Sequence, residues 1–294
     1  MIHRHTLLLF TAICVLQVTA QEPDTTRRSQ SDLLDSIYIA EVEAAHGGRP
    51  KVLHAEPLYI DLIRDLGAHK GEKEWNMGFG ITDNLGYDAY DLLLEYEWAA
   101  LDRIGFEVET PFTFFGQQRP GSDSTQVRPG NQLDGLKLAT QWSFLVNERL
   151  ATSLAVGYIH KFTTRPFNVS EGTLLTGHHY DPFIVAAKRW GHNFHTLIYA
   201  GPQFTYDRTS RSTHTRTGIN TNLHYMISGT RNFVGVEVNK EFSRNDIDMT
   251  FRPQMRVSIA ENLLVGIVTG IPVNRENERF SMFMRLIWEP GHKH

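Results

Sequence analysis

The sequence predicts an all-β fold, an antiparallel transmembrane β-barrel of about twelve strands with a short N-terminal helix. Three observations support this fold class. The 294 residues are 41% hydrophobic, yet the mean hydropathy is −0.31, which excludes a bundle of transmembrane helices. Apolar and polar residues alternate with a period of two in segment after segment. Short polar turns also alternate with longer loops along most of the chain.

Residues 1–20 are expected to be a secretory signal peptide, cleaved near Ala20–Gln21. A mostly apolar run over 7–18 follows a mildly positive start, and small residues precede the cleavage point. The run is shorter than the roughly 20 apolar residues of a transmembrane helix. The alternative is a buried N-terminal helix. Cleavage would remove Cys14, the one cysteine, and with it any disulfide or thiolate chemistry.

Residues 73–82 show the strand pattern in its strictest form. Trp75, Met77, Phe79 and Ile81 share one face, and polar residues or glycine occupy the other. The same alternation occurs over residues 90–98, 104–114, 136–144, 234–239, 249–257 and 279–288. Glycine, histidine and proline blur it over 151–162, 180–189, 194–205, 218–228 and 263–272, which are also expected to be strands.

The connections predict how these strands are joined. Tight polar turns lie near residues 102, 148, 192, 231 and 261. Longer connections are expected at 83–87, 116–132, 164–177, 206–217, 243–248 and 273–278. A sheet in lipid must close on itself, and bacterial barrels have short periplasmic turns and long outer loops. A soluble β-sandwich would show similar alternation of residues but would not need this alternation of loop lengths.

The last strand ends in an aromatic residue, Trp288, before a tail over 289–294. This ending resembles the C-terminal signal that the outer-membrane assembly machinery reads. We therefore expect that machinery and the lipid bilayer as partners, and the outer membrane of a Gram-negative bacterium as the location.

Residues 21–72 are expected to form a periplasmic or plug segment that precedes the barrel at 73–288. A helix is predicted over 57–66, because Pro57 suits a first turn and Leu58, Leu62 and Leu66 recur every four residues before Gly67. It would lie at the periplasmic mouth or in the lumen. Residues 33–45 fit either a helix or an extended piece, and the sequence leaves this open.

Charged residues on the polar faces of the strands are expected to face the lumen. These candidate lumen or transport residues are Glu74, Asp91, Glu95, Glu97, Glu107, Glu109, Lys137, Glu237, Arg252, Arg256 and Arg285. Two interpretations remain open. The charges could form a structural ion-pair network that fills a narrow interior. They could instead create a field across the lumen that selects polar or charged solutes.

Other kinds of site find little support in the sequence. The net charge of −4 argues against a nucleic-acid partner. The chain has no His-x-Ser arrangement of a barrel phospholipase, no nucleophile elbow and no phosphate loop. Histidines near Asp181 and at 192–195 are expected to be ordinary loop residues rather than metal ligands. No catalytic residue, metal or cofactor is therefore expected.

Residues 54–61 spell HAEPLYID, and the string resembles the motif for which the HAEPLYID family of outer-membrane-like proteins is named. Residues 62–76 and 268–279 are also similar to that family, so the resemblance runs from about residue 50 to the end. The motif positions singled out are His54, Glu56, Pro57, Tyr59 and Asp61. The resemblance implies an exported barrel-like protein and supplies no catalytic residues.

Fold and resemblance together favour a passive channel for small polar solutes. The alternative is a non-conducting barrel with a structural or surface-interaction role. An outer-membrane enzyme is the third choice.

Overall fold

The computed structural model describes residues 25–44, 49–60, 62–120, 127–244 and 246–290. The predicted signal peptide and its cleavage point lie outside these residues, as do Asp61 and the end of the C-terminal tail. Within the described part, no helix combines the length and the apolar character needed to cross a bilayer.

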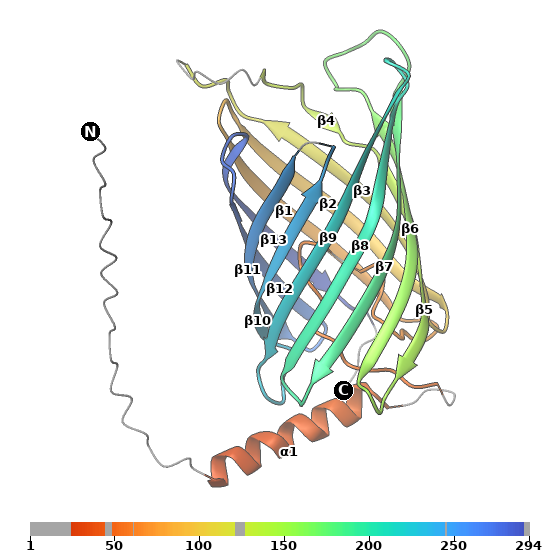
Figure 1. Cartoon of the computed structure of the whole chain (residues 1–294), viewed down its shortest axis with the longest axis vertical. Coiled ribbons are helices and arrows are strands. Elements are labelled where there is room, and N and C mark those ends of the chain that lie inside the picture. Colours follow the sequence, from red (N-terminus) through yellow and green to blue (C-terminus); the bar gives the residue numbers. More distant parts are fainter. Residues whose placement is uncertain (1–24, 45–48, 61, 121–126, 245, 291–294) are drawn as a thin grey trace, which may run out of the picture.

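One antiparallel sheet dominates the structure and closes into a barrel (Figure 1). Its long strands are β1 (Lys73–Asn84), β2 (Asp88–Leu101), β3 (Ile104–Phe115), β5 (Leu136–Asn147), β6 (Thr152–Thr164), β7 (Leu175–Trp190), β8 (Phe194–Asp207), β9 (Ser212–Met226), β10 (Phe233–Phe242), β11 (Ile247–Ala260), β12 (Leu263–Pro272) and β13 (Glu278–Trp288). A two-residue strand, β4 (Gln132–Leu133), pairs with β3. The predicted fold class and strand number are therefore confirmed.

The barrel closes between its first and last long strands. β1 pairs with β2 on one side and with β13 on the other, with Trp75 opposite Trp288. Among the described residues, every long strand thus has a neighbour on each side, so the sheet is closed as a bilayer requires.

The barrel is apolar outside and polar inside. On β1, Trp75 and Met77 are 50% and 39% exposed, whereas the alternating residues Glu74 and Asn76 are 8% and 3% exposed. The same alternation continues around the sheet, with leucines, isoleucines and aromatic residues on the outer surface. A soluble sandwich would bury its apolar face, so this inverted arrangement identifies a membrane barrel.

Reversing the polarity of the outer face is expected to destabilise the barrel. Leu94 on β2 is 40% exposed on that face, and Leu94→Arg should cost about 2–4 kcal/mol, because a guanidinium would enter hydrocarbon. Urea unfolding in lipid vesicles measures the loss. Leu150→Arg, in the turn between β5 and β6, is the matched control and should change little. Equal losses at both positions would contradict the assigned face.

One predicted loop is much shorter than expected. The sequence predicted a loop over 206–217, but β8 and β9 continue until Asp207 pairs with Ser212. The Asp207 carboxylate accepts hydrogen bonds from the backbone N–H groups of Thr209 and Ser210 and so closes a tight turn. The strand was missed because residues 212–217 contain no apolar alternation.

The helix predicted over 57–66 is wrong. Residues 57–60 and 62–66 follow an irregular path, and the described helix is α1 (Thr25–Val42), which answers the question left open for residues 33–45. Leu58, Leu62 and Leu66 are nonetheless buried, and each is at most 2% exposed. Their regular spacing therefore reflects contact with the barrel interior, not a helical stripe.

Helix α1 lies across the end of the barrel that carries the short turns (Figure 1). The Ser31 hydroxyl donates to Ser228 over 2.7 Å, and the Asp35 carboxylate accepts from the backbone N–H of Gly229. Further along the helix, Tyr38 and Val42 pack against a buried apolar cluster of the barrel. The helix thus covers the short-turn end, and the chain then enters the lumen.

Candidate functional site

Five glutamates form one wall of the lumen, which we call the acidic wall. They come from adjacent strands β1, β2 and β3 and are Glu74, Glu95, Glu97, Glu107 and Glu109. The strand register places Glu97 opposite both Glu74 and Glu107, and Glu95 opposite Glu109. Like charges in directly opposed positions destabilise a sheet, so this wall requires cationic partners.

Two of those partners belong to the barrel itself. The Lys137 ammonium on β5 forms ion pairs with Glu109 and, over 2.9 Å, with Glu107. Arg285 on β13 donates to the Glu95 carboxylate over 3.4 Å. These contacts bring the predicted lumen residues of β2, β3, β5 and β13 into one buried network.

The third partner comes from outside the barrel strands. The Arg64 guanidinium lies 2.9 Å from the Glu74 carboxylate and 3.3 Å from that of Glu97. It is 4% exposed, and its backbone carbonyl accepts a hydrogen bond from Gln141 over 2.6 Å. The sequence did not single out Arg64, because no local pattern signals a bond to a distant strand.

Arg64 belongs to the plug segment, residues 50–70, which crosses the lumen at its short-turn end as the orange coil of Figure 1. Several backbone N–H groups of this segment donate to side chains of the barrel strands. The bonds run from Ala55 to His195 (3.0 Å), from Leu58 to Gln254 (2.7 Å), from Ile60 to Glu237 (3.2 Å) and from Gly67 to Ser143 (3.1 Å). Buried backbone donors need partners, and here the barrel supplies them.

Two glycines shape the wall around the plug segment. A Cβ atom at Gly266 on β12 would lie 2.6 Å from a methyl carbon of Leu58. A Cβ atom at Gly105 on β3 would lie 2.5 Å from the Cβ of Arg64. The lumen and the plug segment are therefore complementary in shape as well as in hydrogen bonding.

The plug segment divides the lumen into two cavities. One, of about 390 Å³, opens at the short-turn end and is lined by α1, the plug segment and the acidic wall at Glu74. The other, of about 570 Å³, lies toward the long loops above Tyr59, Ile60 and Ile63. The predicted lumen residue Asp91 lines this outer cavity and accepts a hydrogen bond from Thr113 over 2.9 Å.

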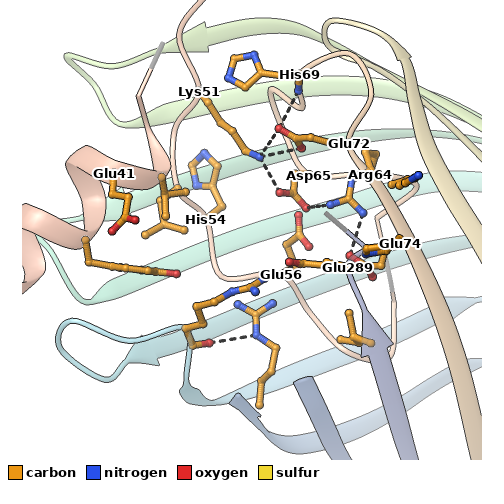
Figure 2. Close-up of a pocket in the computed structure, with 18 of the residues that line it drawn as sticks. Glu41, Lys51, His54, Glu56, Arg64, Asp65, His69, Glu72, Glu74 and Glu289 are labelled. Carbon is orange, nitrogen blue, oxygen red and sulfur yellow. Dashed lines mark hydrogen bonds and ion pairs between the residues drawn. The ribbon is translucent and has the colours of Figure 1, made fainter. Parts of the chain in front are cut away.

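A salt-bridge cluster fixes the plug segment at the short-turn end. Figure 2 shows Lys51 pointing toward Asp65 and Glu72, with its ammonium 2.9 Å from each carboxylate. Burial alone would raise the pKa of Asp65, but Arg64 and Lys51 hold it well below its usual value. Burial raises the pKa of the neighbouring Glu56, and the charge of Asp65 adds to that rise.

None of the described ion pairs joins the predicted basic residues of β11, Arg252 and Arg256, to the acidic wall. The Arg252 guanidinium lies 3.4 Å from the centre of the Tyr59 ring and donates to Asn239. Arg256 donates to the backbone carbonyl of Arg231 over 3.2 Å. On β10, the Glu237 carboxylate accepts hydrogen bonds from the Asn239 amide and from the backbone N–H of Ile60. This side of the lumen therefore binds the plug segment next to Tyr59.

Three buried histidines lie where the plug segment meets β8 and β9. His54 contacts the Ser153 hydroxyl over 2.9 Å, and His195 lies directly opposite His224 in the sheet. Burial, together with repulsion from His195 and Arg189, lowers the pKa of His54 to about 3. His54 is therefore neutral when the plug segment is in place.

Acidification is expected to loosen the plug segment. A released His54 would regain a pKa near 6.5, so the released state binds more protons. The contribution of neutral His54 to the stability of the bound plug segment is complete above pH 6.5 and declines as the pH falls toward 3. Protease cleavage of the plug segment should therefore be faster at pH 5 than at pH 7. His54→Asn keeps a donor for Ser153 but cannot titrate, so it should weaken the pH dependence of cleavage. An unchanged pH dependence would mean that groups other than His54 cause it.

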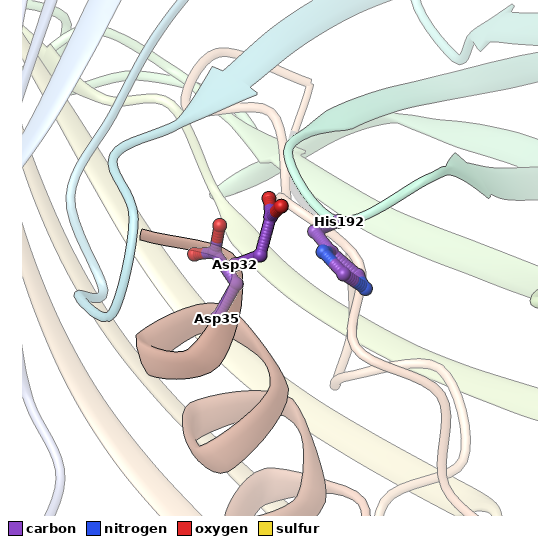
Figure 3. A group of neighbouring side chains, drawn as sticks. All are labelled: Asp32, Asp35 and His192. Carbon is purple, nitrogen blue, oxygen red and sulfur yellow. The ribbon is translucent and has the colours of Figure 1, made fainter. Parts of the chain in front are cut away.

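Asp32 and Asp35 of α1 and His192 of the β7–β8 turn form a second group of polar side chains (Figure 3). One ligand-type atom from each lies within 4.8 Å of the others, which suits a divalent cation in principle. Both carboxylate oxygens of Asp35, however, already accept hydrogen bonds, from Asn193 and from Gly229. Asp35 thus anchors α1 on the barrel rim.

Solved structures with a similar fold are outer-membrane proteins. The COG4313 outer membrane channel from Pseudomonas putida F1 aligns with a TM-score of 0.61 and 12% identity over 76% of this chain and 98% of that one. The KdgM porin in complex with disordered oligogalacturonate gives 0.49 and 12%, over 72% and 98%. At such identities the likeness concerns the fold alone. No curated protein sequence matches the chain.

A family model described as HAEPLYID-like matches residues 50–289. The match spans the plug segment and every strand of the barrel, and the motif that names the family is the part of the chain threaded through the lumen. Of the described motif residues, His54 and Pro57 are buried, Glu56 is half-buried, and Tyr59 is exposed to the outer cavity. This chain belongs to the HAEPLYID-like family.

Proposed function

We propose that the protein is an outer-membrane channel for small polar solutes, closed in the described state by its plug segment. A closed ladder of tilted strands with an apolar outer surface suits the outer membrane of a Gram-negative bacterium, with the short turns in the periplasm. The polar interior and its two cavities suit passage of polar solutes.

One observation carries the proposal. The plug segment contributes no strand to the sheet, and most of its described contacts with the barrel are side-chain hydrogen bonds, ion pairs and packing. A backbone hydrogen bond from the Arg103 N–H in the β2–β3 turn to the Ala68 carbonyl is added at the short-turn end. The plug segment can therefore leave the lumen without breaking a strand pair of the barrel. A segment that was built only to stiffen the barrel would gain more from pairing with the sheet.

A non-conducting structural barrel is the second candidate. The observation in its favour is the buried ion-pair network, which joins β1, β2, β3, β5 and β13 to the plug segment. In that case the same contacts would serve only as a brace.

Deleting residues 21–67 behind an intact signal sequence is expected to separate these functions. A channel closed by its plug should fold and show higher single-channel conductance in planar bilayers, because the deletion joins the two cavities. A brace should instead give a lower unfolding temperature and no gain in conductance. Failure to fold or insert would mean that the plug segment is part of the barrel's core, which would contradict the proposal.

A further inference from the structure

We infer that the acidic wall is a recognition site for solutes that carry a guanidinium or similar organic cation, and that Arg64 occupies it as a built-in substitute. This inference rests on the proposed channel function and names the class of solute. It starts from the way Arg64 is held, because that contact shows which chemistry the wall accepts.

The plug segment presents a guanidinium to two carboxylates of the wall at once. One terminal nitrogen of Arg64 lies within 3.3 Å of both Glu74 and Glu97, and the other lies 3.0 Å from Asp65. A guanidinium carries five N–H donors in a planar fork, which matches carboxylates that converge from neighbouring strands. The plug segment thus already forms the contact that a free guanidinium solute would form.

The charge balance of the wall changes when Arg64 leaves. Lys137 and Arg285 remain on Glu107, Glu109 and Glu95, because they belong to barrel strands. Among the described ion pairs, Glu74 and Glu97 have Arg64 as their cationic partner. An open lumen would therefore expose two carboxylates without a cation, and an incoming cation could take the place of Arg64.

A second feature of the wall points to a missing donor. The Glu95 side chain is 2% exposed, and its Oε2 atom accepts no hydrogen bond from the described residues. A buried carboxylate oxygen without a donor is costly. Glu95 lies directly opposite Glu109, which lines the outer cavity, so a donor that enters from the long-loop side meets this part of the wall first.

Both cavities reach the wall. Glu109 and Lys137 line the outer cavity, while Glu74 and Arg64 line the cavity at the short-turn end. The five glutamates thus follow the lumen past the position of the plug segment. A cation could move from one carboxylate to the next along β1–β3 as Arg64 withdraws.

Competition with Arg64 tests the inference in the full chain. Leu62→Cys places a thiol on the plug segment at a site that is 1% exposed, and its reaction with a water-soluble maleimide reports release. L-Arginine amide at about four times its dissociation constant or more should speed labelling by about fivefold or more, because a ligand that binds only the open wall raises the open population in proportion to one plus the ratio of ligand concentration to Kd. L-Citrulline amide keeps the same shape and α-amine but replaces guanidinium by neutral urea, so it should have little effect.

Two variants locate the effect on the wall. Glu97→Gln in the Leu62→Cys background should remove most of the arginine effect. Glu241→Gln, which breaks an ion pair with Arg216 away from the wall, is the matched control and should retain it. If arginine and citrulline amides act equally, or if CaCl₂ reproduces the arginine effect, recognition of an organic cation is overturned.

A measurement on the unmodified chain tests the inference even if the Leu62→Cys variant fails to fold. The reversal potential of its open state in a KCl gradient should show cation selectivity. Anion selectivity in a conducting barrel would overturn the inference while leaving the channel intact. The proposed function itself is judged separately, by the conductance of the barrel without its plug.

Discussion

Deletion of residues 279–294 is expected to abolish the folded barrel. The deletion removes nearly all of β13, which pairs with both β1 and β12 along most of its length. Two strands would then present unpaired N–H and C=O groups to hydrocarbon, and each such group costs several kcal/mol. The aromatic end at Trp288, opposite Trp75, would also be lost as the predicted signal for the assembly machinery.

Heat-modifiable mobility in gels measures this directly, because a folded barrel migrates differently before and after boiling. Deletion of residues 291–294 alone is the control, since it leaves β13 complete, and it should not change the mobility of the folded form. A protein without residues 279–294 that still migrates as a folded barrel would show that β1 and β12 can close without β13.

Replacing Arg64 is the second change with a large expected effect. Arg64→Ala would leave the buried carboxylates of Glu74 and Glu97 without their cationic partner, and breaking a buried pair in this way costs about 3–5 kcal/mol. The loss should appear as a lower free energy of unfolding in urea.

Arg49→Ala is the matched control for this variant. Arg49 is largely exposed and lies 3.6 Å from Asp102, a surface pair of a kind that contributes little to stability because water screens both charges. A loss of similar size in the two variants would mean that water, and not Arg64, balances the acidic wall.

The barrel itself could be predicted from the sequence because its determinants are local. Each strand carries its own alternation, as in Trp75 to Ile81, and alternation with a period of two assigns side chains to two faces without knowledge of the neighbouring strand. The same rule placed Glu74, Glu95, Glu97 and Glu107 on the inner face, where the structure has them buried.

The plug segment could not be predicted in the same way. Leu58, Leu62 and Leu66 have helical spacing, but a helix forms only if its backbone bonds itself. Here Gln254, Glu237 and Ser143, on strands far away in the sequence, offer acceptors to the backbone N–H groups and make the irregular path favourable.

The partners of individual charges also depended on the closed barrel. The sequence determined that this chain forms a polar-lined barrel, because alternation and turn residues act over a few positions each. Only the tertiary structure decided that Arg64 crosses from the plug segment to Glu74 and Glu97 and that Arg252 faces Tyr59. Such pairings depend on how the sheet closes around the plug segment. The periodicity within one segment cannot predict which residues of distant segments come into contact.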